Sequence, residues 1–387
     1  GADASFPAVL IAQLFAASKN TFLVVVPTEK EADELAADLQ ALSIPVCTFP
    51  WWGTLPYRDM APMSAVFGER IAALSRLLTK KASVIVASER AFLTPLPPVV
   101  YIEELLIELK KGMTLNTVQL ADTLVSYGYT RVPKVQIHGE FALRGEVMDI
   151  FLPGEDEACR LLLDYDRIEA IKQFDPETQS TLATVDTVAL WPAKEVIWSD
   201  DRIEILSKNL EKAEEFATNG HAVLDDLMAR RYTEGEELFF PLAFSKNANL
   251  SEYLGPEGTA FFMDTERLEN AQETLEREYQ GLYGKARRER EVPAPERILL
   301  NFSALAASVQ RKVSFLTLKG SADSGNERIE LPCDPPRSFF GNIVYLKEEL
   351  TNLSSQSWQI HVLAESDSQA GRIGELLKDL PVTVTAF

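Results

Sequence analysis

Continuous and periodic apolar segments alternate in the first hundred residues. Residues 22–26 (FLVVV) and 83–87 (SVIVA) are uninterrupted apolar runs, which is typical of strands covered on both faces. Between them, Thr28 and Glu31 have the spacing of a capping box, and an amphipathic helix follows. Its apolar stripe consists of Ala32, Leu35, Ala36, Leu39 and Leu42. Further elements are a strand at residues 46–49, a buried helix at residues 6–18, and a helix containing Ile71, Leu74 and Leu78. This alternation predicts a parallel α/β sheet.

The pattern changes after the proline-rich residues 95–98 (PLPP). A helix is expected at residues 115–128, with Val118, Ala121, Leu124 and Val125 on its apolar face. Short β-type runs follow at residues 146–151, 160–163 and 168–174, separated by turn-forming residues at 153–154 and 164–167. Such spacing predicts a small antiparallel meander. We therefore expect residues 102–192 to form an α+β domain inserted into the α/β domain.

The last two hundred residues return to alternating patterns. Helices are expected at residues 202–217 and 267–283, with a short buried strand at 258–264. Residues 319–338 are rich in Gly, Ser, Asp and Pro and indicate a linker. A strand, a helix and a strand are expected at residues 358–363, 367–380 and 382–386. The sequence predicts four parts: the first half of an α/β domain (1–101), the insert (102–192), the second half of the α/β domain (193–320), and a linker with a small α/β domain (321–387). In one alternative, the small domain is cut short by the end of the chain.

Composition narrows the class of protein. The 387 residues are 46% hydrophobic and 25% charged, which is ordinary for a soluble globular chain of two to four domains. The sequence contains no run of about 18 apolar residues, so no membrane-spanning helix is expected. The N-terminal residues lack a basic segment and a cleavage site, so we expect a helix there and not a signal peptide. The net charge of −20 disfavours a stand-alone nucleic-acid binder, since phosphate contacts need a basic face.

Cysteine and histidine are sparse. The three cysteines are Cys47, Cys159 and Cys333, and the three histidines are His138, His221 and His361. They are scattered without CxxC or zinc-type spacing, so neither a disulfide framework nor a metal site is expected. The composition fits a cytoplasmic protein.

The key residues of a nucleotide-binding motif are missing at the position where that motif is expected. An ATP-hydrolysing domain of this order needs GxxxxGK[ST] before its first helix. Residues 1–7 here read GADASFP, so Ser5 stands in a degenerate site, and no lysine precedes Lys19. An acidic pair is also needed at a later strand end to hold Mg²⁺, but Asp264 is followed by Thr265. We expect no catalysis and no cofactor in this chain.

Other candidate sites carry weaker signals. Glu140, Asp149, Asp164 and Asp166 could supply an acid/base pair, although acidic residues in such places are usually solvated. Residues 287–290 (RRER) are a dense basic cluster, interpreted as a solvated helix end or as a phosphate or partner site. The aromatic loop residues Phe49, Trp51, Trp52 and Tyr57 could stack on bases or pack on their own domain.

Arg144 and Arg160 are expected on neighbouring strands of the meander. Two guanidinium groups on one sheet edge suit a carboxylate-rich partner, whereas the alternative is two solvated surface arginines.

Several motifs carry a family resemblance. GEFALRGEVMDIFLPG and RLLLDYDRIEAIKQFDPETQ resemble the inserted domain shared by the repair helicase UvrB and the transcription-repair coupling factor (Mfd). LPYRDMAP, GERIAALSRLL and SEYLGPEGTAFFMDTERL resemble the coupling-factor versions of the flanking segments. The resemblance covers residues 1–320 well and the remainder weakly. It implies the N-terminal UvrB-like region of a coupling factor, with a degenerate helicase-like (P-loop-NTPase-like) frame.

The resemblance also implies a role. The family's non-catalytic N-terminal region recruits UvrA, while a separate motor that uses ATP and Mg²⁺ moves on double-stranded DNA and displaces stalled RNA polymerase. The family's UvrA-binding arginines match Arg144 and Arg160. A pair of aromatics is replaced here by Leu163 and Asp164, with Tyr165 next to them. We expect a monomer without membrane contact.

Two other hypotheses stay open. An active UvrB-like ATP-dependent helicase module would turn over ATP despite the missing motif. In an autoinhibited full-length protein, the insert would dock on the C-terminal part and hide the arginines until the motor engages.

Overall fold

The computed structural model describes residues 5–58, 62–79, 83–213, 216, 221–231, 233, 235–316, 329, 341–364 and 366–386. The chain divides into two compact units, Gly1–Glu327 and Arg328–Phe387, and each is described by itself.

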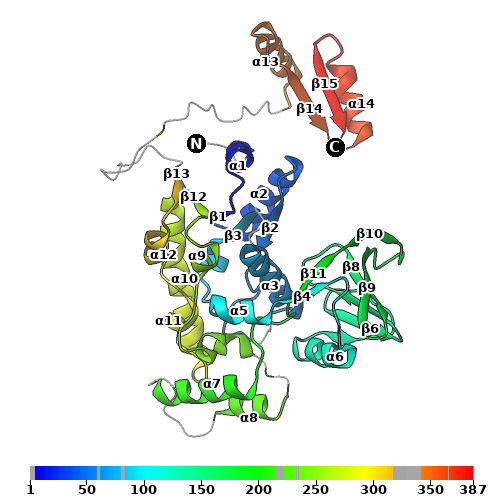
Figure 1. Cartoon of the computed structure of the whole chain (residues 1–387). Helices are drawn as coiled ribbons and strands as arrows, with labels where there is room; N and C mark the ends of the chain where they lie inside the picture. The colour runs from blue at the N-terminus through cyan, green and yellow to red at the C-terminus, as the bar shows by residue number, and fades with distance from the viewer. Residues whose placement is uncertain are drawn as a thin grey trace. The chain divides into compact units, whose positions relative to one another are not determined.

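A five-stranded, fully parallel sheet forms the frame of the first unit (Figure 1). Its order is β13–β12–β1–β3–β2. The strands are β1 (Phe22–Val26), β2 (Val46–Phe49), β3 (Val84–Ser88), β12 (Thr259–Met263) and β13 (Lys312–Phe315). Because β12 pairs directly with β1, residues on either side of the insert belong to one sheet. The prediction of an α/β fold with a parallel sheet is confirmed.

Helices cover both faces of this sheet. On one face, α1 (Ser5–Ser18) and α2 (Glu29–Ala41) bury their apolar sides against alternate residues of β1 and β3. Val9 and Leu14 of α1 are exposed, so this helix is buried on one side only. The opposite face packs against α3 (Ser64–Leu78), α10 (Thr265–Ala286) and α12 (Phe302–Ser308). Thr28 caps α2 as predicted, since its hydroxyl accepts a hydrogen bond from the Glu31 amide at 3.2 Å. The Glu31 carboxylate accepts from the Thr28 hydroxyl at 2.8 Å, whereas a full capping box would use the Thr28 amide.

Shorter elements complete the frame. They are α4 (Glu89–Phe92), α5 (Val99–Leu105), α7 (Asp200–Lys212), α8 (Ala222–Met228), the 3₁₀ helix η2 (Glu236–Ala243), α9 (Leu250–Leu254) and α11 (Pro295–Ile298). At the end of β3, Glu89 is fully buried, and neither carboxylate oxygen has a hydrogen-bond partner among the described residues. Burial raises the pKa of Glu89 to about 8, because desolvation disfavours the charged form.

The insert is built on a six-stranded sheet in the order β10–β9–β8–β7–β6–β5. Its strands are β5 (Thr130–Arg131), β6 (Glu140–Arg144), β7 (Val147–Phe151), β8 (Ala158–Asp164), β9 (Arg167–Phe174) and β10 (Thr181–Val185). Strands β6 to β10 are successively antiparallel, which confirms the predicted meander. A two-stranded antiparallel ribbon of β4 (Ile107–Lys110) and β11 (Thr187–Leu190) joins the two ends of the insert.

The helix of the insert, α6 (Thr117–Ser126), packs on one face of this sheet. It buries Leu120, Ala121 and Leu124, whereas Val118 and Val125 are exposed. Of the predicted apolar face, Ala121 and Leu124 are confirmed, whereas Val118 and Val125 were wrong and Leu120 is buried in addition.

Polar contacts fix the insert to the frame. Arg70 of α3 is fully buried and pairs with Glu195, with Nε–Oε2 at 2.7 Å and Nη2–Oε1 at 3.2 Å. Arg76 of α3 donates to the Gly154 carbonyl of the insert at 2.8 Å. Within the insert, Trp191 Nε1 donates to the Pro153 carbonyl at 3.1 Å.

The second unit contains α13 (Ile343–Ser355), β14 (Ile360–Ala364), α14 (Asp367–Leu376) and β15 (Val382–Ala386), and the two strands pair in parallel. The strand–helix–strand pattern agrees with expectation, and α13 was not predicted. The expected linker at residues 319–338 lies almost entirely outside the described residues.

Candidate protein-docking surface

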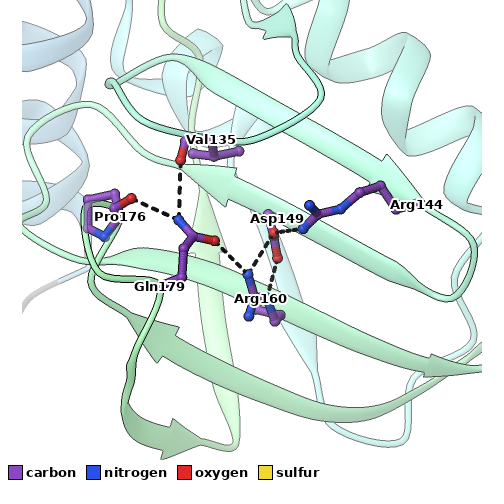
Figure 2. Close-up of polar contacts among 6 residues, drawn as sticks. All are labelled: Val135, Arg144, Asp149, Arg160, Pro176 and Gln179. Carbon is purple, nitrogen blue, oxygen red and sulfur yellow. Dashed lines mark hydrogen bonds and ion pairs between the residues drawn. The ribbon is translucent and has the colours of Figure 1, made fainter.

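One face of the insert's sheet carries a cluster of charged side chains. Successive side chains of a strand point to opposite faces, so one face holds the apolar residues that meet α6, and the other holds Arg144, Asp149 and Arg160. Asp149 lies directly opposite Arg160 on the adjacent strand. Figure 2 shows the three side chains pointing toward one another.

Asp149 accepts hydrogen bonds from both arginines. Arg160 approaches it with two nitrogens, Nε–Oδ1 at 2.6 Å and Nη2–Oδ2 at 2.9 Å, and Arg144 Nη2 lies 2.6 Å from Oδ2 (Figure 2). The Asp149 side chain is 1% exposed, against 20% for Arg160 and 49% for Arg144. The hydrogen bond with Asp149 raises the pKa of Arg160 above its ordinary value, because a bond to the carboxylate favours the charged guanidinium.

The two arginines are held to different degrees. Arg160 also donates to Gln179 Oε1 at 3.1 Å and stacks on the Phe174 ring at 4.4 Å. Gln179 has a left-handed backbone (φ 63°), and its amide nitrogen donates to the Pro176 carbonyl at 2.8 Å (Figure 2). Within the described residues, Arg144 has no hydrogen-bond partner other than Asp149. Arg160 is thus a fixed group, and Arg144 has most of its donors free for a ligand.

The structure corrects one prediction. Arg144 lies on β6 and Arg160 on β8, so they are not on neighbouring strands, and β7 runs between them. Asp149 on β7 lies between them, a position that the sequence alone does not predict. Its position in the apolar run VMDIF was a usable signal, because a buried charge in a strand needs a partner.

The face around the arginines is partly open. Two cross-strand rows cross it: Asp149–Arg160–Lys172, and Arg144–Val147–Leu162–Ala170. Residues Arg144, Val147, Asp149, Arg160, Leu162, Ala170 and Lys172 are called the open face below. Farther along the sheet, Phe151, Ala158 and Phe174 are buried with Val135, so that end is covered.

The other predicted contact residues lie at the end of β8. Leu163 is 4% exposed and belongs to the core on the α6 side. By strand alternation, Asp164 shares the face of Arg160. Tyr165 is 86% exposed in the turn, with φ 56°, and its ring is the accessible aromatic at this end.

The proposed degenerate nucleotide site lies elsewhere. Ser5 is the first residue of α1, and its side chain lies outside the described residues. Asp264 precedes α10 and accepts a hydrogen bond from the Arg267 amide at 3.4 Å, as a helix cap does. Within the described ranges, no group of three or more His, Cys, Asp or Glu is placed to hold a metal ion. No described helix is long and apolar enough to cross a membrane.

The acidic, aromatic and basic candidate residues make contacts within the protein. Glu140 accepts hydrogen bonds from the Gln136 and Ile137 amides at 2.8 and 3.0 Å, and Asp149 is engaged by arginines. The aromatic loop packs on its own domain, with Phe49, Trp51, Trp52 and Tyr57 all buried, as one alternative predicted. Arg287 follows the last turn of α10, and Arg290 donates to the Arg58 carbonyl at 3.0 Å. Burial raises the pKa of the Cys159 thiol to about 12, which makes it unreactive.

Residues 107–196 match the family model of the UvrB interaction domain. The matched range contains the whole sheet that carries the open face, together with the ribbon that joins the insert to the frame. This part of the chain is therefore similar to a domain class known from UvrB.

Relatives extend the similarity to most of the chain. The transcription-repair-coupling factor of Borreliella burgdorferi is 28% identical over 98% of this chain and 33% of its own length. The corresponding protein of Haemophilus influenzae is 32% identical over 78% of this chain and 26% of its own length, and that of Mycobacterium bovis is 31% identical over 63% and 21%. The chain thus spans about a third or less of these relatives. The resemblance to the UvrB-like region of transcription-repair coupling factors is confirmed.

Proposed function

We propose that this chain is a UvrA-docking module of a transcription-repair coupling factor, acting in transcription-coupled nucleotide excision repair. The open face supports this proposal most directly. It presents one fixed guanidinium, that of Arg160, and one exposed guanidinium, that of Arg144, on the same face of a sheet. A carboxylate-rich protein surface is the natural ligand of such a pair. The match to a UvrB interaction domain agrees with a docking role.

The roles of the residues follow from their contacts. Arg160 is the pre-oriented anchor, since Asp149, Gln179 and Phe174 hold its guanidinium. Arg144 is the exposed arm that reaches the partner. Tyr165 adds an aromatic contact, while Asp164 alters the edge where the family resemblance implies an aromatic.

The chain itself is proposed to be non-catalytic, on a degenerate helicase-like frame that binds no nucleotide. The whole protein would use ATP and Mg²⁺ in a separate motor, translocate on double-stranded DNA, and displace stalled RNA polymerase, as a cytoplasmic monomer. An ATPase assay with and without DNA tests the first part, and turnover by this chain would favour the alternative of an active helicase module.

Binding of purified UvrA tests the docking assignment. We expect Arg144→Ala and Arg160→Ala each to weaken binding by at least tenfold, and the double variant to abolish it in a pull-down. Arg131→Ala is the matched control. Arg131 is an exposed arginine of the same sheet, but it pairs with Phe141, whose side chain lies on the face opposite the open face. Circular dichroism checks the fold. Unchanged UvrA binding by a folded double variant would refute the site.

A further inference from the structure

We propose that the docking surface extends past the two arginines to Lys172 and to an apolar strip of Val147 and Leu162, and that it takes an acidic segment with an apolar side chain between its carboxylates. This inference rests on the proposed function and deepens it by naming the chemistry of the partner.

The strand register places Lys172 at the site. Lys172 on β9 lies directly opposite Arg160 on β8, which itself lies opposite Asp149. Directly opposite residues have Cβ atoms roughly 5 Å apart, so the lysine is the immediate neighbour of the anchor arginine. No ion pair of Lys172 is found in the described part of the chain, and its side chain is partly exposed.

The charges of the open face do not balance. It carries three cations, Arg144, Arg160 and Lys172, and one carboxylate, that of Asp149, which pairs with the two arginines. The chain as a whole, in contrast, has a net charge of −20. Like charges directly opposite on a sheet are unfavourable. An external carboxylate would relieve this repulsion, and repulsion elsewhere on the acidic protein would disfavour other docking positions for an acidic segment.

The apolar strip lies in the adjacent row. Val147 pairs with both Arg144 and Leu162, and all three side chains are at least partly exposed on the sheet face. Arg144 and Lys172 lie three strand spacings apart across the sheet, or about 14 Å, and are offset by two residues along the strands. A segment that reaches both with a carboxylate at each end would place its central side chain between β7 and β8, beside Val147 and Leu162. Burial of that side chain would add roughly 25 cal/mol per Å² of apolar surface removed from water.

Calorimetric titration of UvrA into variants of the whole chain tests the extension. We expect Lys172→Glu to weaken binding about tenfold or more and Lys172→Arg to retain it. Lys111→Glu is the matched control, since Lys111 is exposed in the turn after β4. Leu162→Ser is expected to weaken binding about fivefold without changing its salt dependence.

Salt dependence tests the acidic partner. Binding is expected to weaken from 50 to about 300 mM NaCl because exposed charge interactions are screened, and Lys172→Ala is expected to lower that slope. An affinity independent of salt would overturn the acidic assignment. If the arginine variants lose binding while Lys172→Glu binds normally, the extension fails and the proposed function stands. If the arginine variants also bind normally, both fail.

Discussion

Two arginine–carboxylate sites of the first unit differ in a way that separates structure from recognition. Arg70 and Glu195 form a closed pair, in which one guanidinium meets one carboxylate, a third nitrogen donates to the Pro50 carbonyl at 2.8 Å, and the Phe49 ring lies 4.3 Å away. At the open face, one carboxylate serves two arginines. The first site is complete without a partner, whereas the second has donors left over.

The closed pair links residues 125 positions apart and joins α3 to the segment that leaves the insert. Its burial means that neither group can be reached by another protein. The lesson is that unbalanced charge and exposure mark a docking arginine, since the open face shows both and the closed pair shows neither.

Breaking the closed pair should have the largest effect on stability. Arg70→Ala leaves Glu195 buried without its partner, and removal of one member of such a pair costs about 3–5 kcal/mol. We expect a lower midpoint in urea denaturation and unchanged UvrA affinity of the protein that remains folded. Equal stability of this variant and the parent chain would contradict the assigned role.

Glu89 is a third buried carboxyl group and, unlike Glu195 and Asp149, it has no hydrogen-bond partner among the described residues. Its pKa in the folded chain is about 8, whereas an unfolded glutamate titrates near 4.5. Between these values the unfolded state loses a proton that the folded state keeps, so stability should fall as pH rises. The expected loss is roughly 3–4 kcal/mol from pH 5 to pH 8.

Glu89→Gln should remove most of this pH dependence and raise stability at pH 8, as measured by urea denaturation at several pH values. A parallel pH dependence of the variant and the parent chain would show that another group causes it.

Removing the shared carboxylate tests whether Asp149 positions the arginines. Asp149→Asn keeps the shape but leaves two guanidinium groups without their common anion. We expect UvrA affinity to fall about tenfold, which is about 1.4 kcal/mol, mainly through faster dissociation. The stability loss should be smaller than for Arg70→Ala. A variant with native affinity would make Asp149 a packing residue only.

The smallest expected effect is an increase in UvrA affinity. Asp164→Phe places an aromatic at the edge of the open face and removes a negative charge that faces an acidic partner. We expect UvrA affinity to increase about threefold in calorimetry, by apolar burial. Asp156→Phe in the β7–β8 turn is the control. Weaker binding of Asp164→Phe would indicate that the partner uses this carboxylate.

Local patterns predicted much of the fold. Residues 22–26 form a strand as predicted, and the run at residues 83–87 forms β3, shifted by one residue to Val84–Ser88. An unbroken apolar run suits a sheet covered on both sides, and the meander followed from its turn residues. Residues 140–144 were not predicted as a strand, and without β6 the position of β7 between the arginines could not be seen. The stripe of α6 was misjudged because Val118 and Val125 are apolar yet exposed.

The candidate site was predictable in its residues and not in its geometry. Arg144 and Arg160 came from a motif, but their common carboxylate depends on strand order. The Arg70–Glu195 pair could not be foreseen, since nothing local connects positions 70 and 195.

The ribbon of β4 and β11 has a practical consequence. Its register pairs Ile107 with Leu190 and Lys110 with Thr187, so the chain enters and leaves the insert at adjacent points. A domain attached in this way is portable: residues 107–190 could be exchanged between relatives at two neighbouring junctions. Such a graft would transfer the choice of partner while the parallel sheet and its helices stay as they are.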